Sequence, residues 1–287
     1  MIARLAIIGV GLIGSSLALA LREAGVVGHV TGCGRSEQNL RKGVDIGVLD
    51  DYSLSAAEAV RDADVVVLAV PLGAMAAVLE GIRPGLEPDC VITDVGSAKG
   101  SVVADARRVL GPAACRFVAG HPIAGTERSG VEAGFASLYQ GRKIILTPDT
   151  GTDDDALDRV RRMWQATGAE VELMTVEHHD RILAATSHLP HMLAFSLVSH
   201  LSRMSDQDEI FGYAAGGFRD FTRIASSDPV MWRDICLANG DALLALIEGY
   251  QQQLDEISRA IRERDAEHLF ELFRDAKHTR DQLRNLE

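Results

Sequence analysis

Apolar positions along the first 173 residues fall into short runs that alternate with amphipathic, helix-like stretches. The run 65–70 contains no polar residue, which is typical of a strand buried on both faces of a sheet. Regular alternation of strands and helices predicts a parallel sheet covered by helices. The expected strands are 5–9, 29–33, 65–70, 91–95, 117–119, 143–147 and 170–174.

The pattern changes in the second part of the chain. From Glu177 onward, apolar residues recur at helical periods with almost no strand-like run, notably over 181–204 and 229–264. We therefore predict two domains, residues 1–173 with the sheet and residues 174–287 built of helices.

The first strand runs into three glycines, Gly9, Gly11 and Gly14, with the spacing G-x-G-x-x-G, and a helical pattern follows. In this context the spacing is the fingerprint of a Rossmann-type dinucleotide-binding domain. A signal peptide or membrane span is disfavoured, because 5–21 is shorter than the roughly 20 residues that a bilayer requires and no cleavage-type junction follows. The expected fold class is α/β, a Rossmann-type domain followed by an all-helical domain.

Composition narrows the class of protein further. The chain has 287 residues, 47% of them hydrophobic and 24% charged, as expected for a folded protein with two cores. The net charge of −12 argues against nucleic acid as a partner, because phosphate binding requires a basic face. The four cysteines show neither C-x-x-C spacing nor the density of a disulfide framework. We expect a cytoplasmic protein that binds a small molecule and no membrane.

Two segments place polar side chains at the carboxyl ends of predicted strands, where open α/β sheets bind ligands. Ser97 follows the strand 91–95 and could contact cofactor or substrate, although it could also cap the helix 102–110. His121 lies between Gly120 and Pro122, directly after the strand 117–119. A histidine with a pKa near 6.5 is suited to removing a hydroxyl proton as hydride departs, and a structural role in the turn is the alternative.

Two further clusters lie in the helical half. His188 and His191 share one helix face, and Pro190 between them is expected to kink the helix. No third ligand at zinc-like spacing follows, so we expect the imidazoles to hydrogen-bond a ligand and not to hold a metal. Arg219 and Arg223 are four residues apart, and arginine is the planar donor suited to a carboxylate. Pairing with nearby surface aspartates is the alternative.

Together these segments resemble the prephenate and arogenate dehydrogenase family, which makes the tyrosine precursor. The resemblance covers nearly the whole chain, over 9–14, 94–100, 120–130, 187–191 and 216–234. It implies an oxidoreductase that oxidatively decarboxylates prephenate, arogenate or both. Hydride leaves the ring carbon that bears the hydroxyl, carbon dioxide leaves the opposite carbon, and aromatisation drives the reaction.

The resemblance also implies roles for individual residues. His121 accepts the hydrogen bond of the ring hydroxyl, and Ser97 shares that bond on the nicotinamide side. Arg223 binds a substrate carboxylate, Glu127 gates the pocket, and Trp232 lies at the edge of the site in a homodimer formed by the helical domain. The chain ends at Glu287 without a regulatory module, so any inhibition by tyrosine is expected at the active site. The implied substrate-binding residues are Thr126, Glu127, Ser187, His188, His191, Arg223 and Trp232.

The choice of cofactor depends on the residues after the second strand. An NAD enzyme usually carries Asp or Glu about 20 residues after the glycine loop to bind the ribose 2′-hydroxyl, and here that position is Gly34. Arg35 and Ser36 supply a cation and a hydroxyl where a 2′-phosphate would lie, which favours NADP over NAD. Stacking of Arg35 on the adenine of NAD is the alternative. The expected cofactor-binding residues are Gly9, Gly11, Leu12, Ile13, Gly14, Arg35, Ser36, Val70, Pro71 and Ser97.

Two other functions compete with this interpretation. A β-hydroxyacid or 6-phosphogluconate-type dehydrogenase would need a lysine acid/base in its helical half, where the first lysine here is Lys277. A dinucleotide-sensing module without catalysis would not need His121, His191 and Arg223 to converge. Prephenate and arogenate differ by a keto or amino group, and one polar contact can determine that choice.

Overall fold

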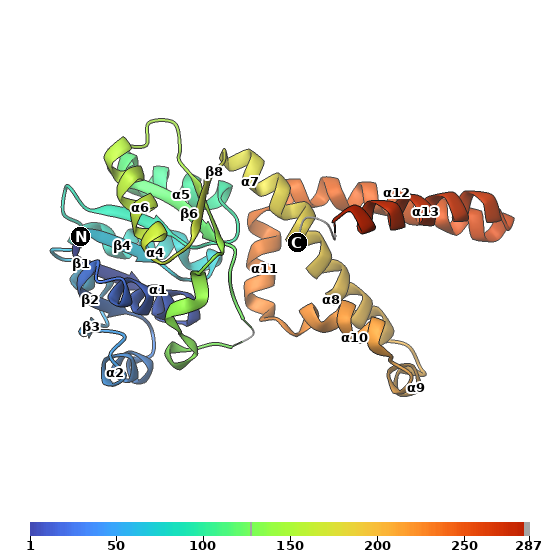
Figure 1. The fold of residues 1–287 in the computed structure, drawn as a ribbon, viewed down its shortest axis with the longest axis horizontal. Helices are drawn as coiled ribbons and strands as arrows, with labels where there is room; N and C mark the ends of the chain where they lie inside the picture. The colour runs from blue at the N-terminus through green and yellow to red at the C-terminus, as the bar shows by residue number, and fades with distance from the viewer. Residues whose placement is uncertain (127, 284–287) are drawn as a thin grey trace. The chain divides into compact units, whose positions relative to one another are not determined.

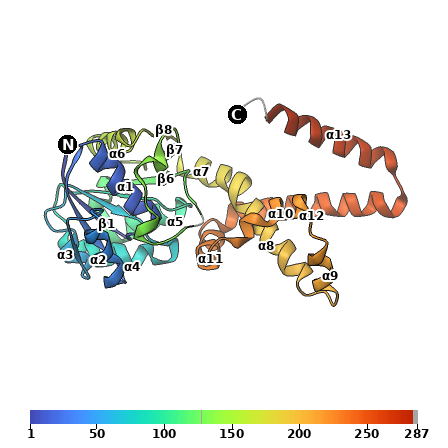
Figure 2. The ribbon, with the colours of Figure 1, turned by 60° about the horizontal axis from the view of Figure 1, so that its bottom comes forward.

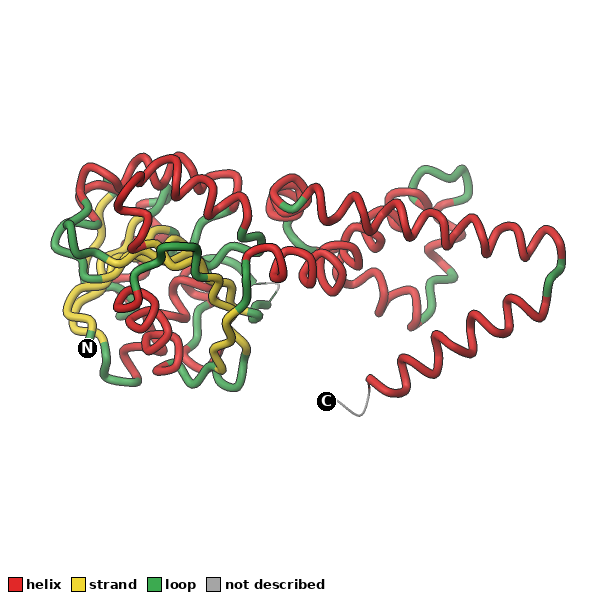
Figure 3. The backbone as a smooth tube through the Cα atoms, turned by 90° about the horizontal axis from the view of Figure 1, so that it is seen from above, coloured by secondary structure: helices red, strands yellow, loops and turns green. Residues whose placement is uncertain are grey.

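The computed structural model describes residues 1–126 and 128–283. The chain divides into two compact units, residues 1–240 and residues 241–287. All strands of the described chain lie within residues 2–173, and helices alone follow, as the colouring in Figure 3 shows. The predicted order, an α/β region followed by a helical region, is confirmed.

One eight-stranded sheet has the order β3-β2-β1-β4-β5-β6-β7-β8 (Figure 1). Its strands are β1 (Ile2–Ile8), β2 (Val27–Cys33), β3 (Asp51–Ser53), β4 (Val65–Leu68), β5 (Val91–Asp94), β6 (Phe117–Pro122), β7 (Lys143–Thr147) and β8 (Glu170–Leu173). Each expected strand is present, and only the short edge strand β3 was not predicted.

The expectation of a wholly parallel sheet is wrong at one pair. All neighbouring strands run parallel except β6 and β7, which are antiparallel. A parallel pair needs a crossover connection, usually a helix. Between β6 and β7 the chain forms only the short 3-10 turns Val131–Ala133 and Ala136–Tyr139, so it re-enters the sheet from the same edge.

Helices cover both faces of the sheet (Figure 2). One apolar cluster joins Val65 and Val67 of β4 to α1 (Leu12–Glu23) and α6 (Asp154–Ala166). The other joins the alternate residues of β4 to the opposite helices. Burial on both faces explains why this strand has no polar alternation. The remaining helices of this region are α2 (Glu37–Asp45), α3 (Ala56–Ala59), α4 (Met75–Ile82) and α5 (Gly100–Leu110), with 3-10 turns at Leu72–Ala74, Arg83–Gly85 and Gly111–Arg116.

The helices after β8 are shorter than the periodicity predicts. A π-helical turn, Ala184–His188, interrupts the expected helix 181–204 just before Pro190, whose missing N–H and ring disturb the helical ladder as expected. By length and composition alone, Val176–Leu201 could cross a membrane, a criterion that core helices of soluble proteins also meet. The helices are α7 (Val176–Leu183), α8 (Leu189–Leu201), α9 (Gln207–Gly212), α10 (Gly216–Thr222), α11 (Pro229–Ala238), α12 (Gly240–Glu263) and α13 (Ala266–Leu283), with a 3-10 turn at Arg223–Ser226.

Candidate active site

The loop between β1 and α1 has the geometry that a dinucleotide requires. Gly9 has a φ of +101°, and a Cβ there would lie 2.1 Å from the carbonyl oxygen of Ala69. A Cβ on Gly14 would lie 2.5 Å from the carbonyl oxygen of Gly9, so strand and helix pack closely here. Gly11 precedes the first turn of α1, and no atom lies within 4 Å of its added Cβ. The loop therefore leaves open space for a pyrophosphate at the helix N-terminus.

The other residues predicted to contact the cofactor lie at the same edge or on the loop after β2. Val70 is close to the glycine loop, because its Cγ1 lies 3.1 Å from the added Cβ of Gly9. Pro71 precedes the 3-10 turn that follows β4. Arg35 is exposed, and the Ser36 hydroxyl caps α2 by accepting a hydrogen bond from the Asn39 amide.

A chain of three polar side chains begins at His121 on β6. His121 is 8% exposed, and its Nδ1 lies 2.9 Å from Nε2 of His179 on α7. Nδ1 of His179 lies 2.8 Å from Oδ1 of Asp180. A carboxylate only accepts, so His179 donates from Nδ1 and its Nε2 accepts the hydrogen bond from Nδ1 of His121. Nε2 of His121 is then the free acceptor of a neutral imidazole.

Asp180 anchors this chain to the edge of the sheet. Its carboxylate accepts hydrogen bonds from the backbone amides of Lys99 (2.8 Å) and Gly100 (2.7 Å) at the start of α5. Burial would raise the pKa of Asp180, but the hydrogen bonds from His179 and the two amides lower it below its usual range. Because Asp180 supplies these contacts, the alternative that Ser97 caps α5 is wrong.

A buried ion pair holds the peptide that precedes His121. Nζ of Lys99 lies 2.5 Å from Oδ2 of Asp94, and both side chains are fully buried. Lys99 also donates to the Gly120 carbonyl (2.7 Å), while Asp94 accepts from the Gly120 amide (3.1 Å). Burial, followed by the Lys99 charge, lowers the pKa of His121 well below 6.5. The imidazole is therefore neutral near pH 7.

The π-helical turn carries two of the predicted substrate-binding residues, Ser187 and His188. Nδ1 of His188 lies 3.1 Å from Nδ2 of Asn239. Burial lowers the pKa of His188 to about 4, although the Asp180 carboxylate and the Ser97 backbone act in the opposite direction. Asn239 also donates to the Asp180 carbonyl (2.8 Å), so it links His188 to the helix that carries the His121 chain.

His191 and Trp232 pack against each other next to the π-helical turn. Their rings stack with centroids 3.7 Å apart and an interplanar angle of 18°. Nδ1 of His191 donates to the Ser187 carbonyl (2.9 Å), which leaves its Nε2 as an acceptor. Trp232 is 7% exposed and thus is buried within a single chain. Burial lowers the pKa of His191, and the nearby charge of Arg223 lowers it further.

Of the remaining predicted residues, the structure describes Arg223 and Thr126. Arg223 begins the 3-10 turn Arg223–Ser226 and lies within electrostatic reach of His191. Thr126 is exposed in the loop after β6, where its hydroxyl accepts a hydrogen bond from the Arg128 amide. Glu127 lies outside the described residues. Over residues 1–126 and 128–283, no group of three or more His, Cys, Asp or Glu is arranged to hold a metal ion.

The structure therefore joins a dinucleotide-type loop to a neutral imidazole acceptor, further histidines and an arginine. The glycines, His121, His188, His191 and Arg223 are residues that the sequence singles out as candidates. The sequence does not single out His179, Asp180, Asn239 or the pair Asp94–Lys99, which act on the predicted residues through hydrogen bonds. The arrangement can accept a hydroxyl proton beside a bound cofactor and can hold an anionic group nearby.

Comparison with known proteins gives consistent matches along the chain. Residues 17–173 match the family model of the prephenate dehydrogenase nucleotide-binding domain, and residues 175–275 match that of the prephenate dehydrogenase dimerization domain. The chain is 38% identical over 278 residues to cyclohexadienyl dehydrogenase of Zymomonas mobilis, covering 96% of this chain and 94% of the relative.

Two solved structures are similar over almost their full length. Prephenate dehydrogenase of Aquifex aeolicus in complex with hydroxyphenyl propionate and NAD+ has a TM-score of 0.91 and 40% identity, covering 99% of both chains. Arogenate dehydrogenase of Synechocystis has a TM-score of 0.81 and 28% identity, covering 97% of this chain and 99% of that one.

Proposed function

The chain belongs to the prephenate dehydrogenase family, and from that premise we propose that it oxidatively decarboxylates prephenate, arogenate or both in tyrosine biosynthesis. The observation that carries the proposal is the hydrogen-bonded chain His121–His179–Asp180, together with a loop after β1 of the same sheet that fits a dinucleotide. A neutral imidazole with a free Nε2 is the group that oxidation of a ring alcohol requires.

The residues of the site would act in two stages. When bound, the nicotinamide supplies the acceptor for the hydride that leaves the ring carbon bearing the hydroxyl. Nε2 of His121 accepts the hydrogen bond of that hydroxyl and takes its proton. After carbon dioxide leaves, the ring becomes aromatic and its oxygen becomes a phenolate. His121 returns the proton to this oxygen, favoured because burial and Lys99 disfavour the charged imidazole.

Turnover itself separates this proposal from the two alternatives. Prephenate or arogenate should produce absorbance of reduced nicotinamide, whereas a sensing module would bind dinucleotide without turnover. A β-hydroxyacid dehydrogenase would reduce the cofactor with a β-hydroxyacid and not with either cyclohexadienyl substrate. Comparing kcat/KM for prephenate and arogenate then defines the preferred substrate.

We propose that Arg223 binds a substrate carboxylate, because its positive charge acts on His191 of the histidine cluster. The Arg223→Lys variant keeps the charge but loses the planar, bidentate donor, so KM for the substrate should rise by about tenfold or more. The KM for the cofactor should change little. A change in substrate KM of less than about threefold, or ~0.7 kcal/mol, would exclude this role.

We propose NADP as the preferred cofactor. Gly34 provides no carboxylate to bind a ribose 2′-hydroxyl or to repel a 2′-phosphate. Arg35 is exposed, and the Ser36 hydroxyl can still donate its own hydrogen while it caps α2. Wild-type kcat/KM should be higher with NADP than with NAD, and Gly34→Asp should reverse that order. Preference of the wild-type enzyme for NAD would show that Arg35 is not a phosphate-binding residue.

We propose a homodimer formed by the helical region. In the unit 241–287, large apolar side chains are exposed, which is typical of a surface covered by a partner. They include Leu244, Leu254, Ile261, Phe270 and Phe273. Sedimentation at micromolar concentration should give a mass near twice the 30.9 kDa of one chain. A fully active monomer would contradict the proposal.

The proposed location is the cytoplasm. All four cysteines are free, and a reducing compartment keeps them so.

A further inference from the structure

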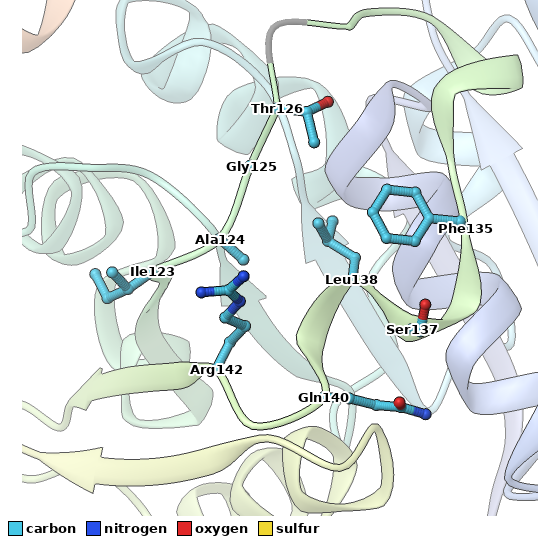
Figure 4. A pocket seen from close by; sticks show the side chains of 9 residues that line it. All are labelled: Ile123, Ala124, Gly125, Thr126, Phe135, Ser137, Leu138, Gln140 and Arg142. Atoms are coloured by element: carbon cyan, nitrogen blue, oxygen red, sulfur yellow. The ribbon is translucent and has the colours of Figure 1, made fainter. Parts of the chain in front are cut away.

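A cavity of about 400 Å³ is lined in part by residues 123–126, the segment that follows β6 (Figure 4). Along β6, Ala119 packs into the apolar cluster on the α4 and α5 side, and His121 has the same parity in the strand. Leu138 and Ala124, which line the cavity, belong to the cluster on the α1 and α6 side. The cavity and the His121 side chain therefore lie on different faces of the sheet.

The cavity combines one cation with several polar groups and the apolar side chains of Phe135 and Leu138. Figure 4 shows the Arg142 side chain reaching toward Ala124, with the Phe135 ring facing it from the other side. No hydrogen bond or ion pair joins the Arg142 guanidinium to another residue in the described part of the chain. Phe135 is 40% exposed and Ile123 is 39% exposed, unlike the buried Leu138. Ser137 and Gln140 add polar groups to the rim.

We propose that this cavity is a second small-molecule site, which binds an aromatic monocarboxylate. The guanidinium of Arg142 offers two parallel N–H donors to a carboxylate, which is its best-matched partner. Phe135 and Leu138 supply an apolar surface for a ring. The volume falls in the range of about 300–1,000 Å³ that small-ligand sites occupy.

Several features favour this ligand class over a simple anion. Among the described residues that line the cavity, Arg142 is the one cation. The next cation along the chain, Lys143, is paired with Glu172 at 2.6 Å. One guanidinium beside apolar side chains suits a single negative charge attached to a ring more than a small multivalent anion. The ligand class follows from the lining residues alone and does not depend on the proposed function.

The cavity also has a physical connection to the catalytic segment. Residues Ile123 to Thr126 form one of its walls and directly follow the strand that carries His121. The Ile123 amide donates to the Lys143 carbonyl at 2.8 Å, which ties this wall to the strand beside Arg142. An occupant would therefore contact Ile123 and Arg142, the neighbour of Lys143, on the two strands that this hydrogen bond joins.

Isothermal titration of the full chain with 4-hydroxyphenylpropionate tests the proposal. The wild type should bind two molecules per chain, one in the cavity and one at the His121 site. Arg142→Gln should weaken one of the two by about tenfold or more and leave the other unchanged. Ser137→Phe, which fills the cavity, should remove the same event. Arg162→Gln, on the exposed face of α6, should bind as the wild type does.

Arg223→Gln separates the two sites, because it should weaken only the event at the His121 site. If the wild type shows no binding event that Arg223→Gln weakens, this result would count against the proposed function and leave the second site intact. Binding that neither Arg142→Gln nor Ser137→Phe changes, whether one event or two, would overturn the second site. A single event that both of these variants weaken would keep the second site and count only against the site at His121. Displacement of the bound probe from the cavity by inorganic phosphate at equal concentration would overturn the assignment to aromatic carboxylates.

Discussion

Replacing His121 with asparagine should lower kcat by about 10²- to 10⁴-fold, the usual contribution of a general base. Asparagine can keep a hydrogen bond to the substrate hydroxyl, but it has no nitrogen that can take the proton. The glycine loop and Val70 remain in place, so the dissociation constant for the dinucleotide should stay near the wild-type value. Steady-state kinetics and a cofactor titration measure the two quantities separately.

The pH dependence provides an independent check on the same residue. Burial lowers the pKa of His121 well below 6.5, so the acid limb of the wild-type kcat/KM profile should lie below pH 6.5. The unfolded chain binds a proton at His121 near pH 6.5 that the folded chain does not, so this histidine makes the protein less stable as pH falls below 6.5. Turnover of the His121→Asn variant at the wild-type rate would end the assignment of His121 as the base.

Replacing Asp180 with asparagine should lower kcat by about 100-fold or more. The carboxylate fixes the proton of His179 on Nδ1 and thereby fixes the proton of His121 on its own Nδ1. An amide can donate as well as accept, so His179 can adopt the other tautomer and Nε2 of His121 is no longer held as an acceptor. The corresponding change in a serine protease triad lowers kcat by about 10⁴-fold because it favours the wrong histidine tautomer.

Glu177→Gln is the matched control, because it removes an exposed carboxylate from the same helix. This variant should keep the wild-type kcat. Asp180 also caps α5, so thermal unfolding of both variants shows how much of the loss is structural. A folded Asp180→Asn enzyme with wild-type kcat and an unchanged pH profile would show that His179 and Asp180 do not position His121.

The sequence contains enough information to predict the features that local chemistry determines. The G-x-G-x-x-G spacing needs small residues at fixed positions, and Gly9 and Gly14 indeed leave no room for a Cβ. The apolar run of β4 is buried on both faces, as its composition predicts. The disturbed helix near Pro190 follows from the chemistry of one residue.

Contacts between distant segments could not be predicted in this way. His121 and His179 are separated by 58 residues, and nothing in their local sequence indicates that their rings meet. The Lys99 ammonium is fully buried, which composition gives no reason to expect for a lysine. The antiparallel orientation of β7 depends on how the preceding loop returns to the sheet. The apolar run of β7 does not indicate in which direction that strand runs beside β6.

The most direct test of the proposed reaction is to measure reduced nicotinamide and carbon dioxide together during a single incubation with prephenate or arogenate. The proposal predicts that the two products form in equal amounts and that both rates fall together in the His121→Asn variant. Reduction of the cofactor without release of carbon dioxide, or no reduction with either substrate, would contradict it.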